Sequence, residues 1–587
     1  MRLFDILYQF HSKYPKPDCL VKKESGKWIP FSTQEFIEHS ENFAYGLLAL
    51  GVQREDKIAI IANNRPEWNF ADMGILMSGC VDIPVYPTIS ESDLKFILND
   101  SQVKFVFVSS EDLFNKIKTI SAEVPSIKEI YTFNNVPIAK HFSELLELGK
   151  KNRDEAKLKA IKDSIKENDL ATILYTSGTT GTPKGVMLSH NNIFSNVYAV
   201  RELPPCDHTC RALSFLPLNH IYERMLNYLY MYLGISIYYA ESLDTISDNL
   251  REVKPQIFTC VPRLLEKVYD RIISKGNELT GIKKILFFWS ISLGEKFQGL
   301  GKGGWWYNFK LGIANKLIFS KWREALGGNV RATVSGGAAL NPRLARIFWS
   351  AQIPVLEGYG LTETSPVIAV NNLRKGGMKF ETVGPVIENV QVKIAEDGEI
   401  LCKGPNIMLG YYKRKDATDE VIDADGYFHT GDIGIIVDGK FLKITDRKKE
   451  IFKTSGGKYI APQMIENKMK EIFLVEQAMV IGENQKFASA LIVPSFIKIK
   501  EMYAKQGITY PGNEEAIKDP EVIKQIKEGM DAVNKTLAHY ETIKKFELLP
   551  REWTVDKGEL TPKLSFKRKV ILEANKNLLE KIYKDSL

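Results

Sequence analysis

Short apolar runs recur along the first part of the chain and alternate with longer stretches of helical periodicity. Several of these runs lack the polar alternation of a half-exposed strand, which is typical of parallel sheets covered on both faces. The alternation therefore predicts an α/β fold with layered sheets. The runs are KIAIIAN (57–63), VKFVFVSS (103–110), ATILYT (171–176), RALSFLPL (211–218), QIFTCVP (256–262) and VRATVS (330–335).

The pattern changes in segment 390–404, VQVKIAEDGEILCKG, which reads as two strands joined at Asp397-Gly398. A second hairpin turn occurs at Asp438-Gly439, and a helix, two strands and a long charged helical stretch follow further along. We therefore expect a large N-terminal domain, residues 1–446, of layered α/β sheets plus an antiparallel β unit. A small α+β C-terminal domain should occupy residues 447–587.

The composition suits a folded protein of this size. Of the 587 residues, 44% are hydrophobic and 26% are charged, which excludes general disorder. The net charge of +7, from 79 basic and 72 acidic residues, favours anionic partners such as nucleotides, CoA or membrane phosphates. We expect no nucleic-acid partner, and the composition leaves the oligomeric state open.

Cysteine usage and hydropathy indicate the compartment. The six cysteines are too sparse for a disulfide framework, and the start, MRLFDILYQFHSKYPKPD, lacks the apolar run of a signal peptide. The longest uncharged stretch, Met225 to Ala240, is shorter than the roughly 20 apolar residues that span a bilayer. These features predict a cytoplasmic protein with no transmembrane segment.

The most informative segment is Tyr175-Thr-Ser-Gly-Thr-Thr-Gly-Thr-Pro-Lys-Gly185, which leaves an expected strand and enters a second β-like run. Its glycines let the backbone approach an anion, its hydroxyl groups can donate hydrogen bonds, and Lys184 supplies a positive charge. A Walker loop requires Gly-Lys-Ser/Thr opening a helix, whereas here Pro183 precedes Lys184 and Gly185 follows it. The segment therefore predicts a different kind of triphosphate cradle, with a flexible polar surface turn as the alternative.

Three further motifs follow in order: Gly358-Tyr-Gly-Leu-Thr-Glu363, Tyr427-Phe-His-Thr-Gly-Asp432 and Asp446-Arg-Lys-Lys-Glu450. Together with residues 176–185 they resemble the adenylate-forming superfamily, which includes acyl-CoA synthetases, luciferase-like enzymes and peptide-synthetase adenylation domains. The resemblance spans essentially the whole chain. It implies ATP, Mg²⁺ and CoA as cofactors, and a small C-terminal domain that rotates about a hinge at Lys449.

The resemblance also assigns roles to single residues. Thr362 would contact the α-phosphate, and Glu363 would bind Mg²⁺ together with Thr180, because a hard cation prefers oxygen ligands. Tyr359 would stack on adenine, and Asp432 would accept hydrogen bonds from the ribose hydroxyls. The full cofactor-binding set is Thr176, Ser177, Gly178, Thr179, Thr180, Gly181, Lys184, Gly337, Glu357, Gly358, Tyr359, Gly360, Thr362, Asp432, Arg447 and the CoA loop Ser455, Gly456, Gly457 and Lys458.

One position departs from the family pattern. Long-chain members commonly carry the adenylation lysine two residues before a Lys-Arg pair, and alignment on Lys567-Arg568 places Ser565 there. A serine cannot supply the missing positive charge. Lys563 and Lys567 are the available substitutes, and they join Thr362, Glu363 and His220 as the predicted catalytic residues.

Branch-level motifs favour a long-chain fatty acid as the substrate. His220 lies in Leu216-Pro-Leu-Asn-His-Ile-Tyr-Glu-Arg224, which is similar to the long-chain version of the acyl-binding motif, and Gly337 lies in Ser335-Gly-Gly-Ala-Ala-Leu340. The expected reaction joins a long-chain fatty acid to CoA through an acyl-AMP intermediate. The alternatives are a ligase for another acid or for a carrier-protein thiol, and a catalytically impaired fatty-acid-binding protein.

Residues 285–322 contain ten aromatic residues and five lysines but only one acidic residue, Glu295. This composition suits a membrane interface, where aromatic rings settle among head groups and lysines meet anionic lipid. The alternative is a helical hairpin packed on the α/β layers. We therefore expect peripheral contact with the inner face of the membrane through this segment.

Overall fold

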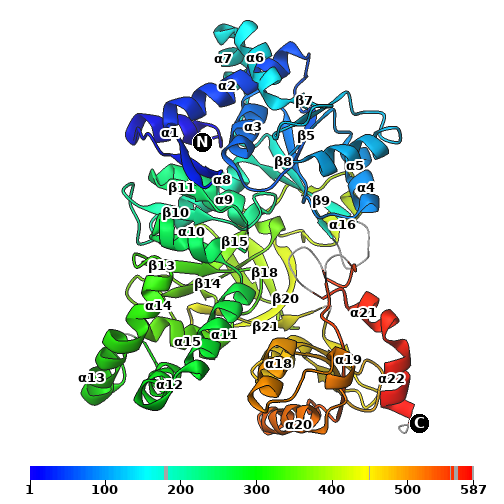
Figure 1. Ribbon diagram of the computed structural model, residues 1–587. Coiled ribbons are helices and arrows are strands. Elements are labelled where there is room, and N and C mark those ends of the chain that lie inside the picture. The colour runs from blue at the N-terminus through cyan, green and yellow to red at the C-terminus, as the bar shows by residue number, and fades with distance from the viewer. Residues whose placement is uncertain are drawn as a thin grey trace. The chain divides into compact units, whose positions relative to one another are not determined.

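A computed structural model of the chain describes residues 1–177, 183–242, 244–299, 301–448, 450–554, 557–560 and 566–584, except for the side chains of Ser177 and Lys505. The chain forms two compact units (Figure 1). Unit 1 comprises Met1–Val392, Cys402–Phe428 and Val437–Leu442, and unit 2 comprises Lys393–Leu401, His429–Ile436 and Lys443–Leu587. The predicted division into residues 1–446 and 447–587 stays a prediction.

The first large sheet of unit 1 has the strand order β19-β9-β8-β4-β3-β5-β6-β7. Its centre is parallel, from β8 to β7, whereas β9 pairs antiparallel with both β8 and β19. The predicted runs 57–63, 103–110 and 171–176 form β3, β5 and β8, as expected. The strands are β3 Lys57–Ile61, β4 Val81–Pro84, β5 Phe105–Val108, β6 Glu129–Thr132, β7 Lys140–His141, β8 Leu170–Ser177, β9 Pro183–Ser189 and β19 Gly410–Tyr411.

The second large sheet has the order β15-β14-β13-β12-β10-β11-β1-β2 and is parallel except at its two edges. The runs 211–218, 256–262 and 330–335 form β10, β12 and β13, so the prediction of layered parallel sheets is confirmed. The strands are β1 Leu20–Glu24, β2 Lys27–Phe31, β10 Arg211–Ser214, β11 Ser236–Tyr239, β12 Ile257–Cys260, β13 Ala332–Ser335, β14 Val355–Gly360 and β15 Val367–Val370.

Helices α8 (His190–Val200) and α9 (Ile221–Leu233) lie between the two large sheets (Figure 1). Because α9 is enclosed on both sides, apolar residues all round its axis belong to the main core cluster. The other helices of unit 1 are α1 Asp5–Lys13, α2 Thr33–Ala49, α3 Pro66–Met77, α4 Glu91–Ser101, α5 Glu111–Ser121, α6 Phe142–Lys151, α7 Glu155–Ser164, α10 Ile246–Val253, α11 Pro262–Glu278, α12 Gly281–Glu295, α13 Gly304–Ala314, the π-helical η1 Asn315–Phe319, α14 Ser320–Ala325, α15 Pro342–Ser350, the 3₁₀ turn η2 Thr362–Thr364 and α16 Lys415–Asp419.

A five-stranded sheet with the order β16-β21-β20-β18-β17 corresponds to the predicted antiparallel β unit. The turns at Asp397-Gly398 and Asp438-Gly439 join its neighbouring strands, as the sequence predicts. Asp438 and Gly439 both have positive φ, 52° and 64°, which a tight two-residue hairpin requires. The strands are β16 Gly384–Pro385, β17 Gln391–Ile394, β18 Glu399–Lys403, β20 Phe428–Val437 and β21 Phe441–Arg447.

The C-terminal part of unit 2 is a small α+β structure around the sheet β24-β25-β26. Its two core clusters pack against the two faces of this sheet, because alternate residues of β24 belong to different clusters. The elements are β22 Phe452–Lys453, β23 Tyr459–Ile460, α17 Pro462–Met469, β24 Val475–Ile481, β25 Ser489–Pro494, α18 Phe496–Lys505, α19 Asn513–Ala516, α20 Pro520–Asn534, β26 Lys545–Leu548, α21 Arg568–Ala574 and α22 Lys576–Tyr583.

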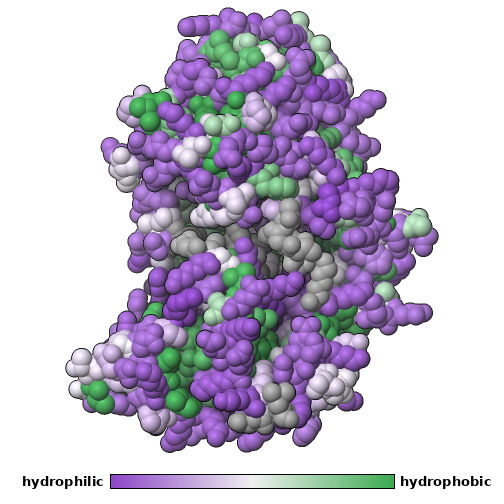
Figure 2. Space-filling view, turned by 90° about the vertical axis from the view of Figure 1, so that its right-hand side faces the viewer, coloured by the Kyte–Doolittle hydropathy of each residue, from purple (hydrophilic) through white to green (hydrophobic). Residues whose placement is uncertain are grey.

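No helix within the described ranges is both long enough and apolar enough to cross a membrane. The face drawn in Figure 2 is mostly hydrophilic, with apolar residues in small separate groups.

Candidate active site

The predicted phosphate segment connects two paired strands, β8 and β9. Thr176 lies opposite Lys184 in this antiparallel pair, and Ser177 lies opposite Pro183. The side chains of Thr176 and Lys184 are half-buried. The hairpin therefore brings both ends of the segment together, as a phosphate-binding loop requires. Gly178, Thr179, Thr180 and Gly181 lie outside the described residues.

Tyr411, which the sequence analysis did not predict as a site residue, contacts both Lys184 and Glu363. The Nζ atom of Lys184 lies 5.0 Å from the centre of the Tyr411 ring, and Tyr411 Oη donates a hydrogen bond of 2.9 Å to Glu363 Oε1. Burial and the Glu363 carboxylate raise the pKa of Tyr411 well above its usual value, so its hydroxyl remains a donor. The hydroxyl thus orients the predicted metal-binding carboxylate.

Backbone hydrogen bonds explain why these side chains converge. β19, which ends at Tyr411, pairs with β9, and Tyr412 N donates to Gly185 O at 2.7 Å. Met408 N donates to Glu363 O at 2.9 Å. One short segment is therefore bonded to both motifs. Because neighbouring Tyr412 has the same side chain, residue type alone could not have identified Tyr411.

The second motif begins on β14 and ends in η2. Gly360 is required by packing, because a Cβ there would lie 1.7 Å from Pro366 O. Thr362 is buried, and Tyr359 and Gly358 pair with Ala369 and Val370 of β15. Close packing at Gly360 and pairing with β15 therefore determine the backbone conformation of the motif up to Glu363.

Glu357 precedes this motif on β14. Burial and Glu381 raise the pKa of its carboxyl, the Leu340 backbone lowers it, and the net pKa is about 8. The carboxyl group therefore carries a proton at neutral pH, which would let it donate as well as accept a hydrogen bond.

His220 caps the N-terminus of α9. Its Nδ1 atom accepts a hydrogen bond of 3.1 Å from Tyr222 N, which places the proton of a neutral ring on Nε2. The Tyr222 ring packs over Gly336, where a Cβ would approach it to 3.2 Å. The next residue, Gly337, has a φ of +82°, which favours glycine. The capping bond gives His220 a structural role, and its catalytic role stays a prediction.

The same helix carries a fully buried cation, Arg224. Its guanidinium forms an ion pair with Asp72, its Nη2 lies 3.0 Å from Oδ2 of Asp82, and its Nη1 donates to Thr172 Oγ1 at 2.8 Å. Thr172 lies on β8, the strand that leads to Thr176. Arg224 therefore connects the helix of the acyl motif to the strand of the phosphate motif.

The predicted ribose residues lie in unit 2. Asp432 is buried on β20, and its Oδ1 lies 3.4 Å from Nε of Arg447 at the end of β21. The structure brings together these two residues, which are 15 positions apart in the sequence. Their roles in binding ribose remain predictions.

The predicted CoA loop is an exposed turn between β22 and β23. Ser455, Gly456, Gly457 and Lys458 are all exposed, and the positive φ of Gly457, +77°, fits its place in the turn. Lys567 precedes α21, and its backbone N–H bonds Glu559 O at 2.8 Å. Lys449, Lys563 and Ser565 lie outside the described residues.

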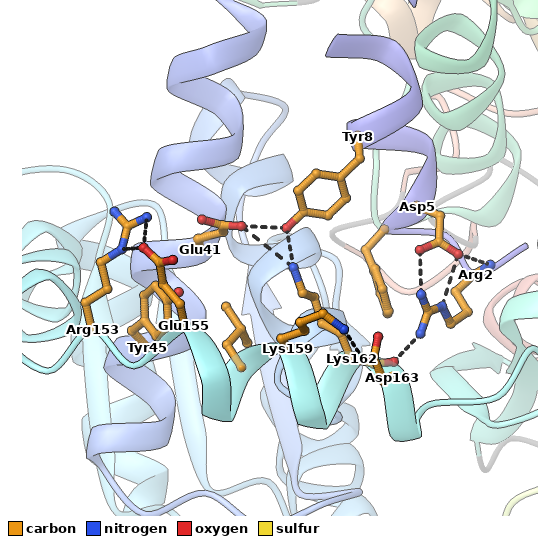
Figure 3. Close-up of a pocket in the computed structure, with 12 residues that line it drawn as sticks. Arg2, Asp5, Tyr8, Glu41, Tyr45, Arg153, Glu155, Lys159, Lys162 and Asp163 are labelled. Atoms are coloured by element: carbon orange, nitrogen blue, oxygen red, sulfur yellow. Dashed lines mark hydrogen bonds and ion pairs between the residues drawn. The ribbon is translucent and has the colours of Figure 1, made fainter. Parts of the chain in front are cut away.

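A cavity of about 450 Å³ lies elsewhere in unit 1, between α1, α2 and α7 (Figure 3). None of the predicted site residues lines it. Lys162 Nζ donates to Tyr8 Oη at 2.8 Å, and Tyr8 Oη donates to Glu41 Oε1 at 2.7 Å (Figure 3). The polar groups at its centre therefore bond to one another, and the cavity belongs to a helix junction.

Two family models match the chain. The AMP-binding enzyme model covers residues 8–412, and the model of the AMP-binding enzyme C-terminal domain covers residues 449–587. The chain belongs to the AMP-binding enzyme family. The long-chain-fatty-acid–CoA ligase FadD15 of Mycobacterium bovis is 33% identical to this AMP-binding enzyme, over 98% of this chain and 96% of its own.

A second relative supports this membership, and a solved structure shows the fold. The peroxisomal long chain acyl-CoA synthetase 7 of Arabidopsis thaliana is 33% identical over 92% of this chain and 79% of its own. The crystal structure of the adenylation domain of a carboxylate reductase from Mycobacterium chelonae has a TM-score of 0.75 and is 22% identical, over 100% of this chain and 91% of that one. The fold is therefore that of adenylation enzymes, as the sequence predicts.

Proposed function

We propose that this chain is a long-chain fatty acid–CoA ligase. It would activate the acid with ATP through an acyl-AMP intermediate and transfer the acyl group to CoA, giving acyl-CoA, AMP and pyrophosphate. The observation that supports this most strongly is the 33% identity to a long-chain-fatty-acid–CoA ligase along almost the full length of both chains. Similarity that covers both domains favours the complete two-step reaction over a binding function.

Described side chains in each unit support the proposal that the chain binds ATP and Mg²⁺. Lys184 and Thr176 flank the segment that would hold the β- and γ-phosphates, and Asp432 with Arg447 would hold the ribose. Within the described residues, no three His, Cys, Asp or Glu side chains form a metal cage. A single oriented carboxylate, Glu363, suits Mg²⁺, which commonly keeps waters and binds substrate phosphates. When bound, the ion would neutralise charge at the phosphates.

The second half-reaction would involve the C-terminal domain, residues 447–587, rotating at Lys449. Such a rotation lets one site present different groups for adenylation and for thiol attack. Ser455, Gly456, Gly457 and Lys458 would then line the CoA channel. Lys563 or Lys567 would supply the positive charge that Ser565 lacks.

The test is AMP and pyrophosphate release from ATP and palmitate, with and without CoA, in the wild type, Lys563→Ala and Lys567→Ala. We expect AMP formation to depend on CoA and to fall about 100-fold in one lysine variant, because that charge stabilises the adenylation transition state. Turnover with a carrier protein but not with CoA would favour the carrier-thiol alternative. Turnover only with another acid would correct the substrate, and no turnover with any acid would favour the binding-protein alternative.

We also propose that α13 and η1 contact the membrane, as peripheral attachment at the cytoplasmic face requires. Their exposed apolar side chains recur at every fourth position: Trp305, Phe309, Ile313 and Leu317 are 75%, 51%, 37% and 46% exposed, with Trp306 beside them at 57%. We call these five residues the aromatic stripe. The opposite side of α13 packs into the core of unit 1, so the stripe is a second apolar face.

The lysines around the stripe favour contact with an anionic lipid surface. Lys302, Lys316 and Lys321 are exposed, and Lys310 lies 5.5 Å from the Trp306 ring. The one acidic residue of the segment, Glu295, pairs with Arg343. Lysines beside exposed tryptophans suit the head-group region of anionic bilayers.

Removing the aromatic stripe should release the protein from anionic vesicles. We expect Trp305→Ala/Trp306→Ala/Phe309→Ala to lower partitioning onto phosphatidylglycerol-containing vesicles about tenfold or more in co-sedimentation, because three interfacial anchors are lost. The control, Phe473→Ala/Ile497→Ala, removes side chains of similar exposure, 53% and 71%, and should bind as the wild type does. Equal binding of the stripe variant and the control would contradict the proposal.

A further inference from the structure

Glu399 is a buried carboxylate that was not among the predicted site residues. It is the first residue of β18, directly after the Asp397-Gly398 turn, and its side chain is 6% exposed. Oε1 accepts a hydrogen bond of 2.9 Å from Gly431 N, and Oε2 accepts one of 2.8 Å from Lys448 Nζ. Nδ1 of His429 lies 3.1 Å from Oε2. One carboxylate therefore joins the segment before Asp432 to the segment before Lys449.

The backbone closes this arrangement into a ring. Lys448 N donates to Gly431 O at 2.8 Å, while Gly431 N donates to Glu399. The N–H of Gly431 therefore bonds Glu399 and its C=O bonds Lys448, and Glu399 and Lys448 also bond each other. The neighbouring pair, Asp432 and Arg447, adds an ion contact of 3.4 Å beside the ring. The proposed ribose carboxylate and the residues before the hinge therefore share one connected set of contacts.

The charge of Glu399 is maintained despite its burial. Burial raises the pKa of the carboxyl, but Lys448, His429 and the Gly431 N–H lower it, and the net shift is downward. Glu399 is therefore ionised at neutral pH, where its hydrogen bonds are charge-assisted and stronger than neutral ones.

Asp397 and Glu399 differ in burial and in their hydrogen bonds. It also pairs with Lys448, at 2.6 Å, but its side chain is 51% exposed at the hairpin tip. An exposed pair of this kind contributes little to stability. The two carboxylates share the Lys448 ammonium, and within the described contacts Glu399 is the one that also bonds Gly431.

We propose that Glu399 is a positioning residue that couples nucleotide binding at Asp432 to the hinge segment that precedes Lys449. The inference rests on the proposed function in one respect, namely that Asp432 binds the ribose. Ribose contacts that restrict the motion of Asp432 also restrict the neighbouring Gly431. Gly431 in turn restricts Lys448, directly through its carbonyl and indirectly through Glu399. A carboxylate is required because it alone can accept from the amide and from the ammonium with full charge.

The test compares Glu399→Gln with the control Asp397→Asn, which removes the other charge beside Lys448. AMP binding is measured by titration calorimetry, and hydrogen exchange of residues 445–448 is followed with and without AMP. Lys448→Met serves as a second variant, because it cuts the same connection at an exposed lysine whose loss should leave the fold intact. Activity assays with ATP separate the KM for ATP from kcat.

We expect Glu399→Gln to weaken AMP binding and raise the KM for ATP about tenfold, with kcat changed less than about twofold, as for the loss of one charge-assisted hydrogen bond. AMP should slow exchange at residues 445–448 in the wild type and in Asp397→Asn, but not in Glu399→Gln or Lys448→Met. The same slowing in all four proteins would overturn the proposal, as would a lower melting temperature with unchanged AMP binding. If AMP binds but no acid is activated, the proposed function fails while this coupling stands.

Discussion

Replacing Glu363 with glutamine should lower kcat/KM for acyl-CoA formation about 100-fold or more, because a neutral amide is a poor ligand for Mg²⁺ at the phosphates. The substitution preserves shape and leaves an oxygen that can accept the hydrogen bond from Tyr411 Oη. The melting temperature should therefore change by less than about 2 °C, which separates chemistry from folding. Steady-state rates with palmitate, ATP and CoA across a range of Mg²⁺ concentrations measure the effect. The half-saturating Mg²⁺ concentration should rise together with the loss of rate.

Tyr411→Phe is the matched comparison for this prediction. It removes only the hydroxyl that orients Glu363, so we expect a fall in kcat/KM of about five- to tenfold, the usual effect of one hydrogen bond. Glu388→Gln, on an exposed carboxylate that pairs with Arg201, should have no effect. Wild-type rates in Glu363→Gln would show that the metal is held elsewhere.

Six strands of the two large sheets, β3, β5, β8, β10, β12 and β13, were predictable because their apolar runs are visible in the local sequence. The runs at 57–63 and 211–218 are largely apolar on both strand faces, which is typical of strands in a parallel sheet covered on both sides, and they form β3 and β10. The Asp438-Gly439 turn was predictable because few residue pairs adopt two positive φ angles in succession. Hence the layered fold and its hairpins follow from patterns only a few residues long.

The connections between motifs could not be predicted in the same way. Tyr411 reaches Glu363 across 48 positions, and Arg224 reaches Asp72 across 152. No local periodicity encodes such pairs, because they arise only when the strands assemble. Glu399 was overlooked for a related reason. The preceding Asp-Gly turn predicts the backbone of a hairpin, but it does not predict which residues the Glu399 side chain contacts.

Replacing Arg224 with methionine should lower the free energy of unfolding of unit 1 by about 3–5 kcal/mol, the cost of leaving a buried carboxylate without its partner cation. Asp72 is 1% exposed and accepts hydrogen bonds from Arg224 and Tyr228. Methionine preserves apolar volume beside Trp68 but provides no donor. Urea unfolding followed by tryptophan fluorescence measures the loss, because every tryptophan except Trp553 lies in unit 1.

Asp82→Asn tests the same cluster through its pH dependence. Burial raises the pKa of Asp82, Arg224 lowers it and the nearby Asp72 raises it, and the net pKa is about 8. Because the folded pKa exceeds the ordinary value near 4, the stabilising contribution of this carboxyl is complete below about pH 4 and is lost as the pH rises through about 8. The unfolding free energy of Asp82→Asn should therefore fall less than that of the wild type between pH 5 and pH 8. Parallel pH profiles would mean that Asp82 stays ionised and that Arg224 neutralises both carboxylates.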